Sequence, residues 1–137
     1  MNKIVLASHG KLASGILSSL ELICGEIKNI STLDCYLTEN FDLNLEVKKI
    51  IEDNQENEII IVTDLFGGSV NNEFINYIDR SNIFLIAGLN LPFLIELVGS
   101  SSNESTEEKI KKALKNSKES IQYCNESIKK ELLEEEF

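Results

Sequence analysis

The sequence predicts an α/β fold, a doubly wound and mainly parallel sheet with helices on both faces. Short runs rich in β-branched residues alternate with amphipathic stretches, which is typical of β-α-β units. Residues 59–63 (Ile-Ile-Ile-Val-Thr) are apolar almost throughout, as expected for a central strand buried on both faces. The 137 residues contain no linker or internal repeat, so we expect one domain with one core.

The elements follow one another in order along the chain. Residues 3–8 form the first strand, and Leu12, Ile16, Leu20 and Ile23 then recur at helical spacing until Gly25 ends the helix. The later predicted elements are strand 28–35, helix 42–54, strand 59–63, helix 69–80, strand 83–87, a short helix after Pro92, and a helix near 106–118. Right-handed crossovers favour the flavodoxin-like strand order 2-1-3-4.

The segment after these elements is ambiguous. Residues 120–124 alternate briefly between polar and apolar side chains, which fits a short strand. Ile121, Cys124 and Ile128 equally fit the spacing of a continuing helix. The pattern alone does not separate the two.

The composition of the chain argues against several classes of function. The net charge of −10 argues against nucleic-acid binding, and it would suit a protein partner with a basic docking face. One histidine and three scattered cysteines make a zinc site improbable and suggest reduced thiols. No apolar run approaches a membrane span and no signal-peptide pattern is present, so we expect a soluble, cytoplasmic protein. Nucleotide-binding glycine motifs are also absent, and we expect no cofactor and no metal.

His9 is the only histidine, and it stands where the first strand ends and a helix begins. A histidine nucleophile needs one free ring nitrogen, and a carboxylate that accepts the other N–H fixes that tautomer. In the predicted topology the ends of the first and third strands meet in one crevice, so His9 and Asp64 should face each other. The plainer alternatives are a histidine that caps a strand and an aspartate that hydrogen-bonds its own turn.

Two helix N-termini are expected to converge on His9. Gly67 and Gly68 allow a sharp bend that brings backbone amides close to a ligand, and Ser69 is predicted to be the N-cap of the next helix. Unpaired amides at such ends favour an anion, so the arrangement fits a transient phosphoryl group on imidazole. A hydrolytic triad of Ser69, His9 and Asp64 remains formally possible, although a capping serine would be occupied.

Three segments together resemble a known family. They are residues 8–15 (Ser-His-Gly-Lys-Leu-Ala-Ser-Gly), 63–69 (Thr-Asp-Leu-Phe-Gly-Gly-Ser) and 87–94 (Ala-Gly-Leu-Asn-Leu-Pro-Phe-Leu). In this order and spacing they are similar to the IIA component of the mannose/fructose/sorbose class of the bacterial phosphoenolpyruvate-dependent sugar phosphotransferase system. The resemblance covers roughly residues 1–124, which we take as the domain, and leaves 125–137 as an acidic tail.

The resemblance implies a phosphocarrier. His9 would accept a phosphoryl group on Nε2 from the carrier HPr and pass it to a IIB component, with the IIC/IID membrane permease involved indirectly. Asp64 matches the aspartate that orients the histidine. Ser69 and the amide around Ile23 match positions that hold the phosphoryl oxygens, and we add Gly10 and Gly68 to these candidates.

The resemblance also implies how two copies of the chain assemble. Members of the family are dimers in which a C-terminal strand crosses onto the partner's sheet, so residues 121–124 are expected to form that strand, followed by a poorly ordered or helical tail. Val70 departs from the family, which usually has proline there; valine keeps the helix but loses rigidity.

Three other functions are weighed against this one. The phosphotransfer subunit of a dihydroxyacetone kinase has a first domain that resembles this chain, but residues 88–92 and the absence of further domains favour the sugar system. A non-catalytic module that docks partners according to the phosphorylation of His9 is the second. The third, a flavodoxin-like small-molecule binder, would need no His-Asp pair at the crevice.

Overall fold

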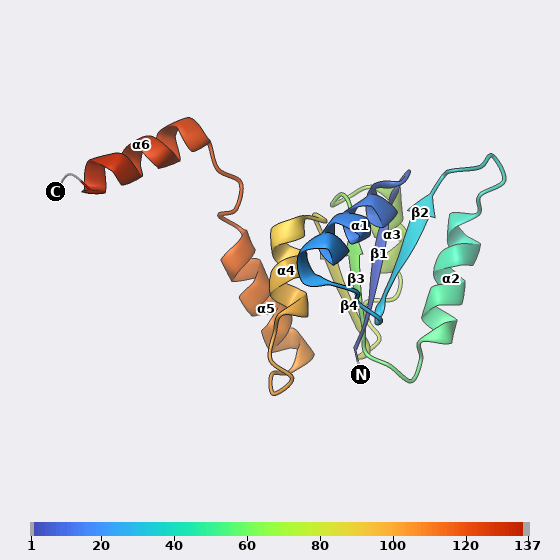
Figure 1. The fold of residues 1–137 in the computed structure, drawn as a ribbon. Coiled ribbons are helices and arrows are strands. Elements are labelled where there is room, and N and C mark those ends of the chain that lie inside the picture. Colours follow the sequence, from blue (N-terminus) through green and yellow to red (C-terminus); the bar gives the residue numbers. More distant parts are fainter. Residues whose placement is uncertain (1, 136–137) are drawn as a thin grey trace.

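The computed structural model describes residues 2–135 and contains a four-stranded parallel sheet (Figure 1). Its strands are β1 (Lys3–His9), β2 (Ile30–Cys35), β3 (Ile59–Thr63) and β4 (Ile83–Ala87). They lie in the order β2-β1-β3-β4, with all three pairings parallel. The predicted fold class and strand order are therefore confirmed. All five residues of β3 are buried, as its apolar sequence indicated.

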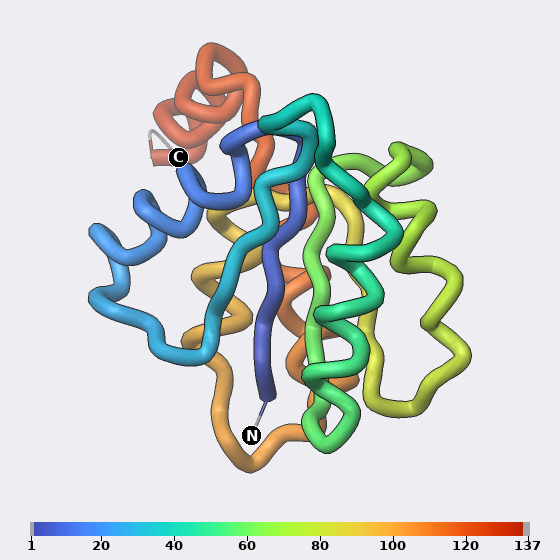
Figure 2. Tube along the Cα trace, turned by 90° about the vertical axis from the view of Figure 1, so that its right-hand side faces the viewer, coloured from blue at the N-terminus to red at the C-terminus, as the bar shows by residue number. Residues whose placement is uncertain are grey.

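Helices cover both faces of the sheet (Figure 2). The helices are α1 (Leu12–Cys24), α2 (Leu43–Asp53), α3 (Ser69–Ile75), α4 (Leu91–Val98), α5 (Thr106–Ser117) and α6 (Cys124–Glu135). One core cluster joins the sheet to α1, α4 and α5 through side chains such as Leu20, Phe93 and Ile110. The other joins it to α2 and α3 through Val47 and Phe74. The single core expected from the sequence is thus divided by the sheet into two layers.

Polar side chains fix where several helices begin. Asp42 accepts a hydrogen bond from the Leu45 amide at the start of α2, and Asn90 accepts one from the Phe93 amide at the start of α4. Ser105 forms a capping box at the start of α5. Each cap satisfies an amide that has no carbonyl partner within its helix.

Two details of the helices differ from the predictions. The helix expected over 69–80 ends at Ile75, because the amides that follow bond to carbonyls three residues back, such as Tyr77 to Phe74 and Ile78 to Ile75. These tighter turns end the α-helix. In α1, Leu12 and Ile23 are exposed, and Ala13 and Leu20 are the buried residues. The apolar spacing located the helix, but its buried face is rotated from the predicted one.

The C-terminal segment leaves the body of the domain. Residues 121–123 have no regular secondary structure, so the short strand expected over 121–124 is not formed within this chain. Helix α6 follows from Cys124 with no buried residue. In Figure 1 this helix extends away from the sheet. Among residues 2–135, no helix is long and apolar enough to cross a membrane.

Cys35 is fully buried at the end of β2, whereas Cys24 and Cys124 are exposed. Burial, together with the nearby negative charge of Asp64, raises the pKa of the Cys35 thiol to about 11. The thiol therefore stays protonated and shielded at pH 8, and the thiolate is the reactive form. We expect iodoacetamide at pH 8 to modify two cysteines in the native protein and all three in urea. Equal rates at all three sites without urea would contradict this placement.

Candidate functional site

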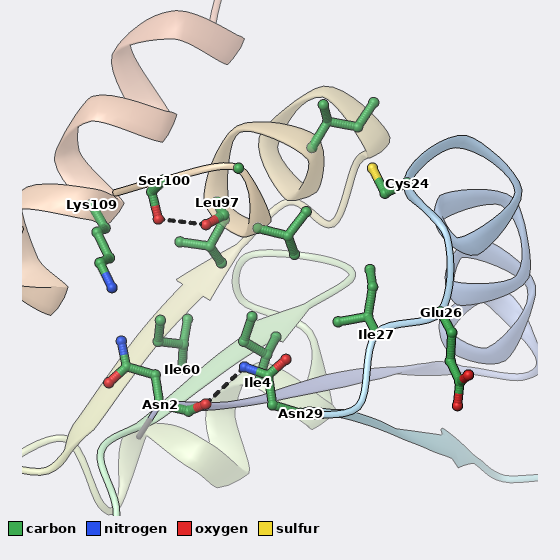
Figure 3. A pocket seen from close by; sticks show the side chains of 13 residues that line it. Asn2, Ile4, Cys24, Glu26, Ile27, Asn29, Ile60, Leu97, Ser100 and Lys109 are labelled. Atoms are coloured by element: carbon green, nitrogen blue, oxygen red, sulfur yellow. Dashed lines mark hydrogen bonds between the residues drawn. The ribbon is translucent and has the colours of Figure 1, made fainter. Parts of the chain in front are cut away.

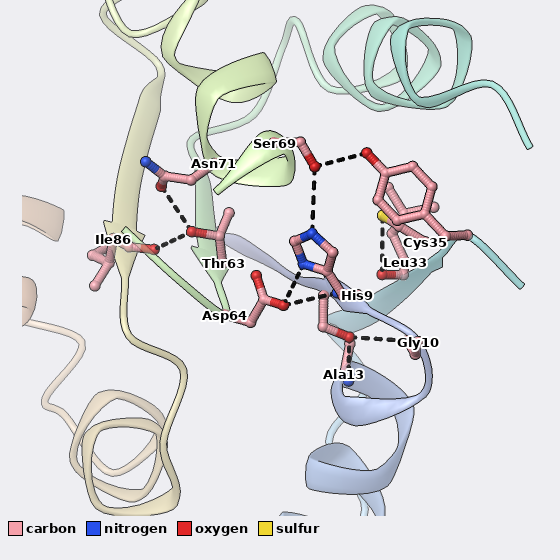
Figure 4. Close-up of polar contacts among 12 residues, drawn as sticks. His9, Gly10, Ala13, Leu33, Cys35, Thr63, Asp64, Ser69, Asn71 and Ile86 are labelled. Atoms are coloured by element: carbon pink, nitrogen blue, oxygen red, sulfur yellow. Dashed lines mark hydrogen bonds and ion pairs between the residues drawn. The ribbon is translucent and has the colours of Figure 1, made fainter. Parts of the chain in front are cut away.

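The site lies at the carboxyl ends of the central strands, where the sequence placed it. His9 is the last residue of β1, and Asp64 directly follows β3, the strand that pairs with β1. The His9 backbone amide donates to Asp64 Oδ2 at 2.8 Å, and His9 Nδ1 lies 2.8 Å from the same oxygen (Figure 4). The strand order thus brings together two residues separated by 55 positions in the sequence.

Asp64 is held as a carboxylate. Partial burial by itself would raise the pKa of Asp64, but the hydrogen bonds from the backbone and ring of His9 outweigh it and lower the pKa below its usual range. A carboxylate accepts a hydrogen bond from Nδ1–H, so His9 takes the tautomer in which Nε2 carries a lone pair. The His9 side chain is 45% exposed, so a partner can reach the ring.

Ser69 occupies the Nε2 side of the ring. Its Oγ lies 3.4 Å from His9 Nε2 and 2.8 Å from Tyr36 Oη. The first contact is long, which leaves the Nε2 lone pair weakly engaged. The prediction that Ser69 is an N-cap is wrong: Gly68 is the cap, in an extended conformation, and Ser69 is the first residue of α3. Because it does not cap the helix, the Ser69 hydroxyl is available to the site.

Gly68 and Gly10 shape the backbone around the ring. A Cβ on Gly68 would stand 3.5 Å from His9 Cε1 and 3.2 Å from the Leu65 side chain, so glycine permits this close approach. Gly10 has a φ of +60°, which favours glycine in this tight turn. The amides of both glycines bond to backbone carbonyls, that of Gly10 to Cys35 and that of Gly68 to Leu65. Their contribution to the site is therefore conformational.

The start of α1 is not the free anion site that the sequence suggested. The Ala13 amide donates to Ser8 Oγ at 2.8 Å, and the Ser14 amide donates to Asp34 Oδ1 at 3.0 Å. Asp34 also accepts from the Ser14 hydroxyl, which puts a carboxylate at this helix end. Because both amides already have side-chain partners and the Asp34 carboxylate is negative, this helix end attracts a phosphoryl group only weakly. The expectation of two converging free helix ends is wrong for α1.

Ile23 lies far from His9 in the same chain. It stands near the end of α1, about 16 Å along the helix from Leu12 at a rise of 1.5 Å per residue. Its neighbour Cys24 lines a pocket of about 560 Å³ at the opposite end of the sheet, together with Asn2 and Ile4 (Figure 3). Within one chain, the structure therefore does not support the assignment of the Ile23 amide to the phosphoryl site. The resemblance alone suggested it, and the antiparallel return of α1 moves it away.

Tyr36 is a residue of the site that the sequence analysis missed. Its ring centroid lies 5.4 Å from that of His9, and its hydroxyl contacts Ser69. The signal available in the sequence was position: Tyr36 directly follows β2, the other neighbour of β1, so it belongs to the same edge of the sheet. Among residues 2–135, no group of three or more His, Cys, Asp or Glu side chains could hold a metal ion.

Comparisons with known proteins agree with this geometry. The family model EIIA-man, which describes fructose IIA components of the phosphotransferase system (PTS), matches residues 3–114. The fructose-specific EIIA component of Bacillus subtilis is 24% identical over 133 residues, covering 95% of this chain and 91% of that protein. The sorbose-specific EIIA component of Lacticaseibacillus casei is 25% identical, covering 98% and 99%.

A solved structure is similar over nearly the whole chain. It is a Klebsiella pneumoniae protein assigned to the phosphoenolpyruvate-dependent sugar phosphotransferase system (PTS), with a TM-score of 0.89 and 44% identity. The alignment covers 93% of each chain. The chain described here thus belongs to the EIIA family of the mannose/fructose/sorbose class of the PTS.

Proposed function

We infer that this chain is a cytoplasmic phosphocarrier that accepts a phosphoryl group on His9 from phosphorylated HPr and passes it to a IIB component. The observation that carries the proposal is the paired contact of Asp64 with the backbone amide and Nδ1 of His9. It leaves Nε2 unprotonated and exposed, which is the state a nucleophile requires. Membership of the EIIA family supplies the donor and acceptor classes.

The transfer needs no proton to leave the attacking nitrogen. The Nε2 lone pair of His9 forms the new N–P bond while the N–P bond of the donor phosphohistidine breaks, and the donor nitrogen keeps that electron pair. Nδ1–H stays bonded to Asp64, whose charge balances the cationic ring as the bond forms. The Ser69 hydroxyl can donate to a phosphoryl oxygen. Positioning and electrostatics therefore provide most of the catalysis.

Exposed apolar side chains near the site supply a docking surface for both partners. They come from the start of α1 and the loops after β2 and β3: Leu12, Tyr36, Leu37, Leu65 and Phe66. Exposed residues of this kind mark sites of protein contact. An in-line transfer between two histidines requires such close docking, because each ring must reach the same phosphorus atom.

The direct test is stepwise transfer with purified components. HPr is phosphorylated by enzyme I and phosphoenolpyruvate, enzyme I is removed, and this chain is added in EDTA. We expect one acid-labile phosphoryl group per chain, followed by its loss to a cognate IIB protein. Loss of transfer in EDTA that magnesium restores would contradict the metal-free mechanism. Labelling without onward transfer to any IIB protein would favour a regulatory module, and transfer to a dihydroxyacetone kinase instead would favour that system.

One alternative, a serine hydrolase, has a specific basis because the Ser69 hydroxyl faces His9 and does not cap α3. Ser69, His9 and Asp64 have the connectivity of a hydrolytic triad. In the phosphocarrier, Ser69→Ala should slow phosphorylation of His9 without preventing it. In a serine hydrolase the same variant would lose its nucleophile, and the wild-type serine would react with a fluorophosphonate probe.

We also infer a homodimer built on the outer edge of β4, with the domain ending near residue 124 and the tail beyond it. β4 is an edge strand, and the groove of about 700 Å³ beside it is lined by its own residues together with side chains of α3 and α5, such as Ile75 and Leu114. Ile121 is 94% exposed and lies in a segment without regular structure. A strand from residues 121–124 of a second copy would cover both the edge and the groove.

Two truncations test this assembly. Removal of everything after Ser120 deletes the crossing strand and should give a monomer with a lower melting temperature. Removal of everything after Glu126 keeps that strand and should leave the dimer intact, which makes it the matched control. Sedimentation at micromolar concentration measures the oligomeric state of the two truncated proteins, and thermal unfolding measures their melting temperatures. A full-length chain that sediments as a monomer would contradict the proposal.

A further inference from the structure

We propose that Tyr36 is a positioning residue, which orients the Ser69 hydroxyl so that its proton points to the phosphoryl group on His9. This inference rests on the proposed phosphorylation of His9 and assigns a role to a side chain outside the three motifs of the family resemblance. It concerns a hydrogen-bonded series that runs from Tyr36 through Ser69 to the attacking nitrogen.

The contacts define that series. Tyr36 Oη lies 2.8 Å from Ser69 Oγ, and Ser69 Oγ lies 3.4 Å from His9 Nε2. On the other side of the ring, Nδ1 contacts Asp64 at 2.8 Å. Figure 4 shows Ser69 and Asp64 on opposite sides of the His9 ring. Both nitrogens of the ring are thus contacted by residues from other elements.

The proton positions follow from the carboxylate. Asp64 can only accept, so Nδ1 holds the ring proton and Nε2 is an acceptor. Ser69 must then donate toward Nε2, and its oxygen is left to accept from the Tyr36 O–H. When Nε2 becomes bonded to phosphorus, the Ser69 O–H is already directed to that side and can donate its hydrogen bond to a phosphoryl oxygen instead. Without Tyr36, the serine hydroxyl is free to rotate away.

The ring of Tyr36 is held in place by its surroundings. It packs edge-on against Phe41 with centroids 5.3 Å apart, and it is tilted by 39° against His9. Tyr36 has a φ of +65°, and it is the one non-glycine residue between 2 and 135 with a positive φ. That conformation is unfavourable for a residue with a Cβ, and it persists where the surrounding structure enforces it.

The strained conformation and the hydroxyl contact are independent observations on the same residue. A phenylalanine could make the same edge-on contact with Phe41, but it would lack the hydroxyl that contacts Ser69. Strained residues that the fold retains cluster at functional sites. Together they assign Tyr36 a role in the site and not only in packing.

The test is a double-mutant cycle on single-turnover transfer from phosphorylated HPr. Tyr36→Phe keeps the ring and removes the hydroxyl. We therefore expect the maximal transfer rate constant to fall about tenfold, the value of one hydrogen bond, with the half-saturating concentration of phosphorylated HPr nearly unchanged. In a Ser69→Ala background, Tyr36→Phe should change that rate constant by less than about twofold, because Tyr36 acts through Ser69. Tyr77→Phe is the matched control, since Tyr77 packs in the core layer of α2 and α3.

Two results of this cycle would contradict the inference. A Tyr36→Phe variant as fast as wild type shows that the hydroxyl is idle, and an equal loss with and without Ser69 shows that Tyr36 does not act through the serine. Tyr36→Gly accepts the positive φ, so it should fold and yet transfer at least as slowly as Tyr36→Phe. If wild-type protein itself takes no phosphoryl group from HPr, the proposed function fails, which is a distinct result.

Discussion

His9→Ala is expected to abolish phosphorylation by HPr, with labelling reduced by on the order of 1,000-fold or more. The chain contains one histidine, so no second imidazole can accept the group. His9 is 45% exposed at the end of β1, and its side chain is not part of either core cluster. Its removal should therefore leave the fold intact. The measurement is incorporation of acid-labile phosphate from phosphoenolpyruvate.

Two controls separate chemistry from folding. His9→Gln keeps a polar side chain of similar length and should be equally unlabelled, because an amide nitrogen is not a nucleophile. Circular dichroism and thermal unfolding of both variants should match those of the wild type. If His9→Ala still takes up label to the wild-type extent, the phosphoryl group resides elsewhere and the mechanism proposed here is wrong.

Topology was the part of the fold most open to prediction from sequence. The apolar run of β3 fixed a central strand, and the alternation of strands with helices then left few arrangements. Because this strand order places β1 beside β3, the contact of His9 with Asp64 follows from the topology. Such a contact depends on backbone topology, which short-range patterns determine well.

Contacts that depend on side-chain competition were harder to predict. Ser69 has the residue type and position of an N-cap, yet Gly68 caps the helix because its extended backbone precedes the first turn. The amides of α1 were expected to be free, but Ser8 and Asp34 reach them from β1 and β2. Capping preferences are local, whereas these partners come from other strands.

Tyr36 shows a further limit of sequence reasoning. Tyr36 has a positive φ and its hydroxyl contacts Ser69, and the residue type tyrosine indicates neither feature in advance. Ile23 shows the reverse case: its role came from the resemblance alone, and the length of α1 places it far from His9 in the same chain. Position relative to the carboxyl ends of the strands favours Tyr36, which directly follows β2, as a site residue, and it disfavours Ile23, near the end of α1.

Asp64→Asn should slow transfer to His9 by on the order of 100-fold or more while leaving the fold intact. Asp64 Oδ2 accepts both the backbone amide and Nδ1–H of His9, each at 2.8 Å. An asparagine can present its NH₂ group to Nδ1, which favours the tautomer with the proton on Nε2 and blocks attack. Even with its oxygen in place, the neutral amide no longer balances the charge on the ring.

The matched control is Asp34→Asn. Asp34 also lies near the end of its strand, but its oxygens accept from the amide and hydroxyl of Ser14 and do not contact the His9 ring. The same chemical change there should alter the rate by less than about threefold, since a charge without direct contact is screened. Equal losses in the two variants would mean that net charge, and not the contact with Nδ1, controls the reaction.

The lowered pKa of Asp64 also gives the pair a defined pH dependence. Burial opposes ionisation, but the hydrogen bonds from His9 prevail, so the folded-state pKa lies below the ordinary value of about 3.9. The stability that Asp64 contributes is therefore fully present above that ordinary value and is lost as the pH falls through the lower folded value. Urea unfolding at several pH values should show this loss in the wild type and its absence in Asp64→Asn. If both proteins lose stability equally across that acid range, the carboxylate is not held by His9 in solution, and the tautomer argument for Nε2 loses its basis.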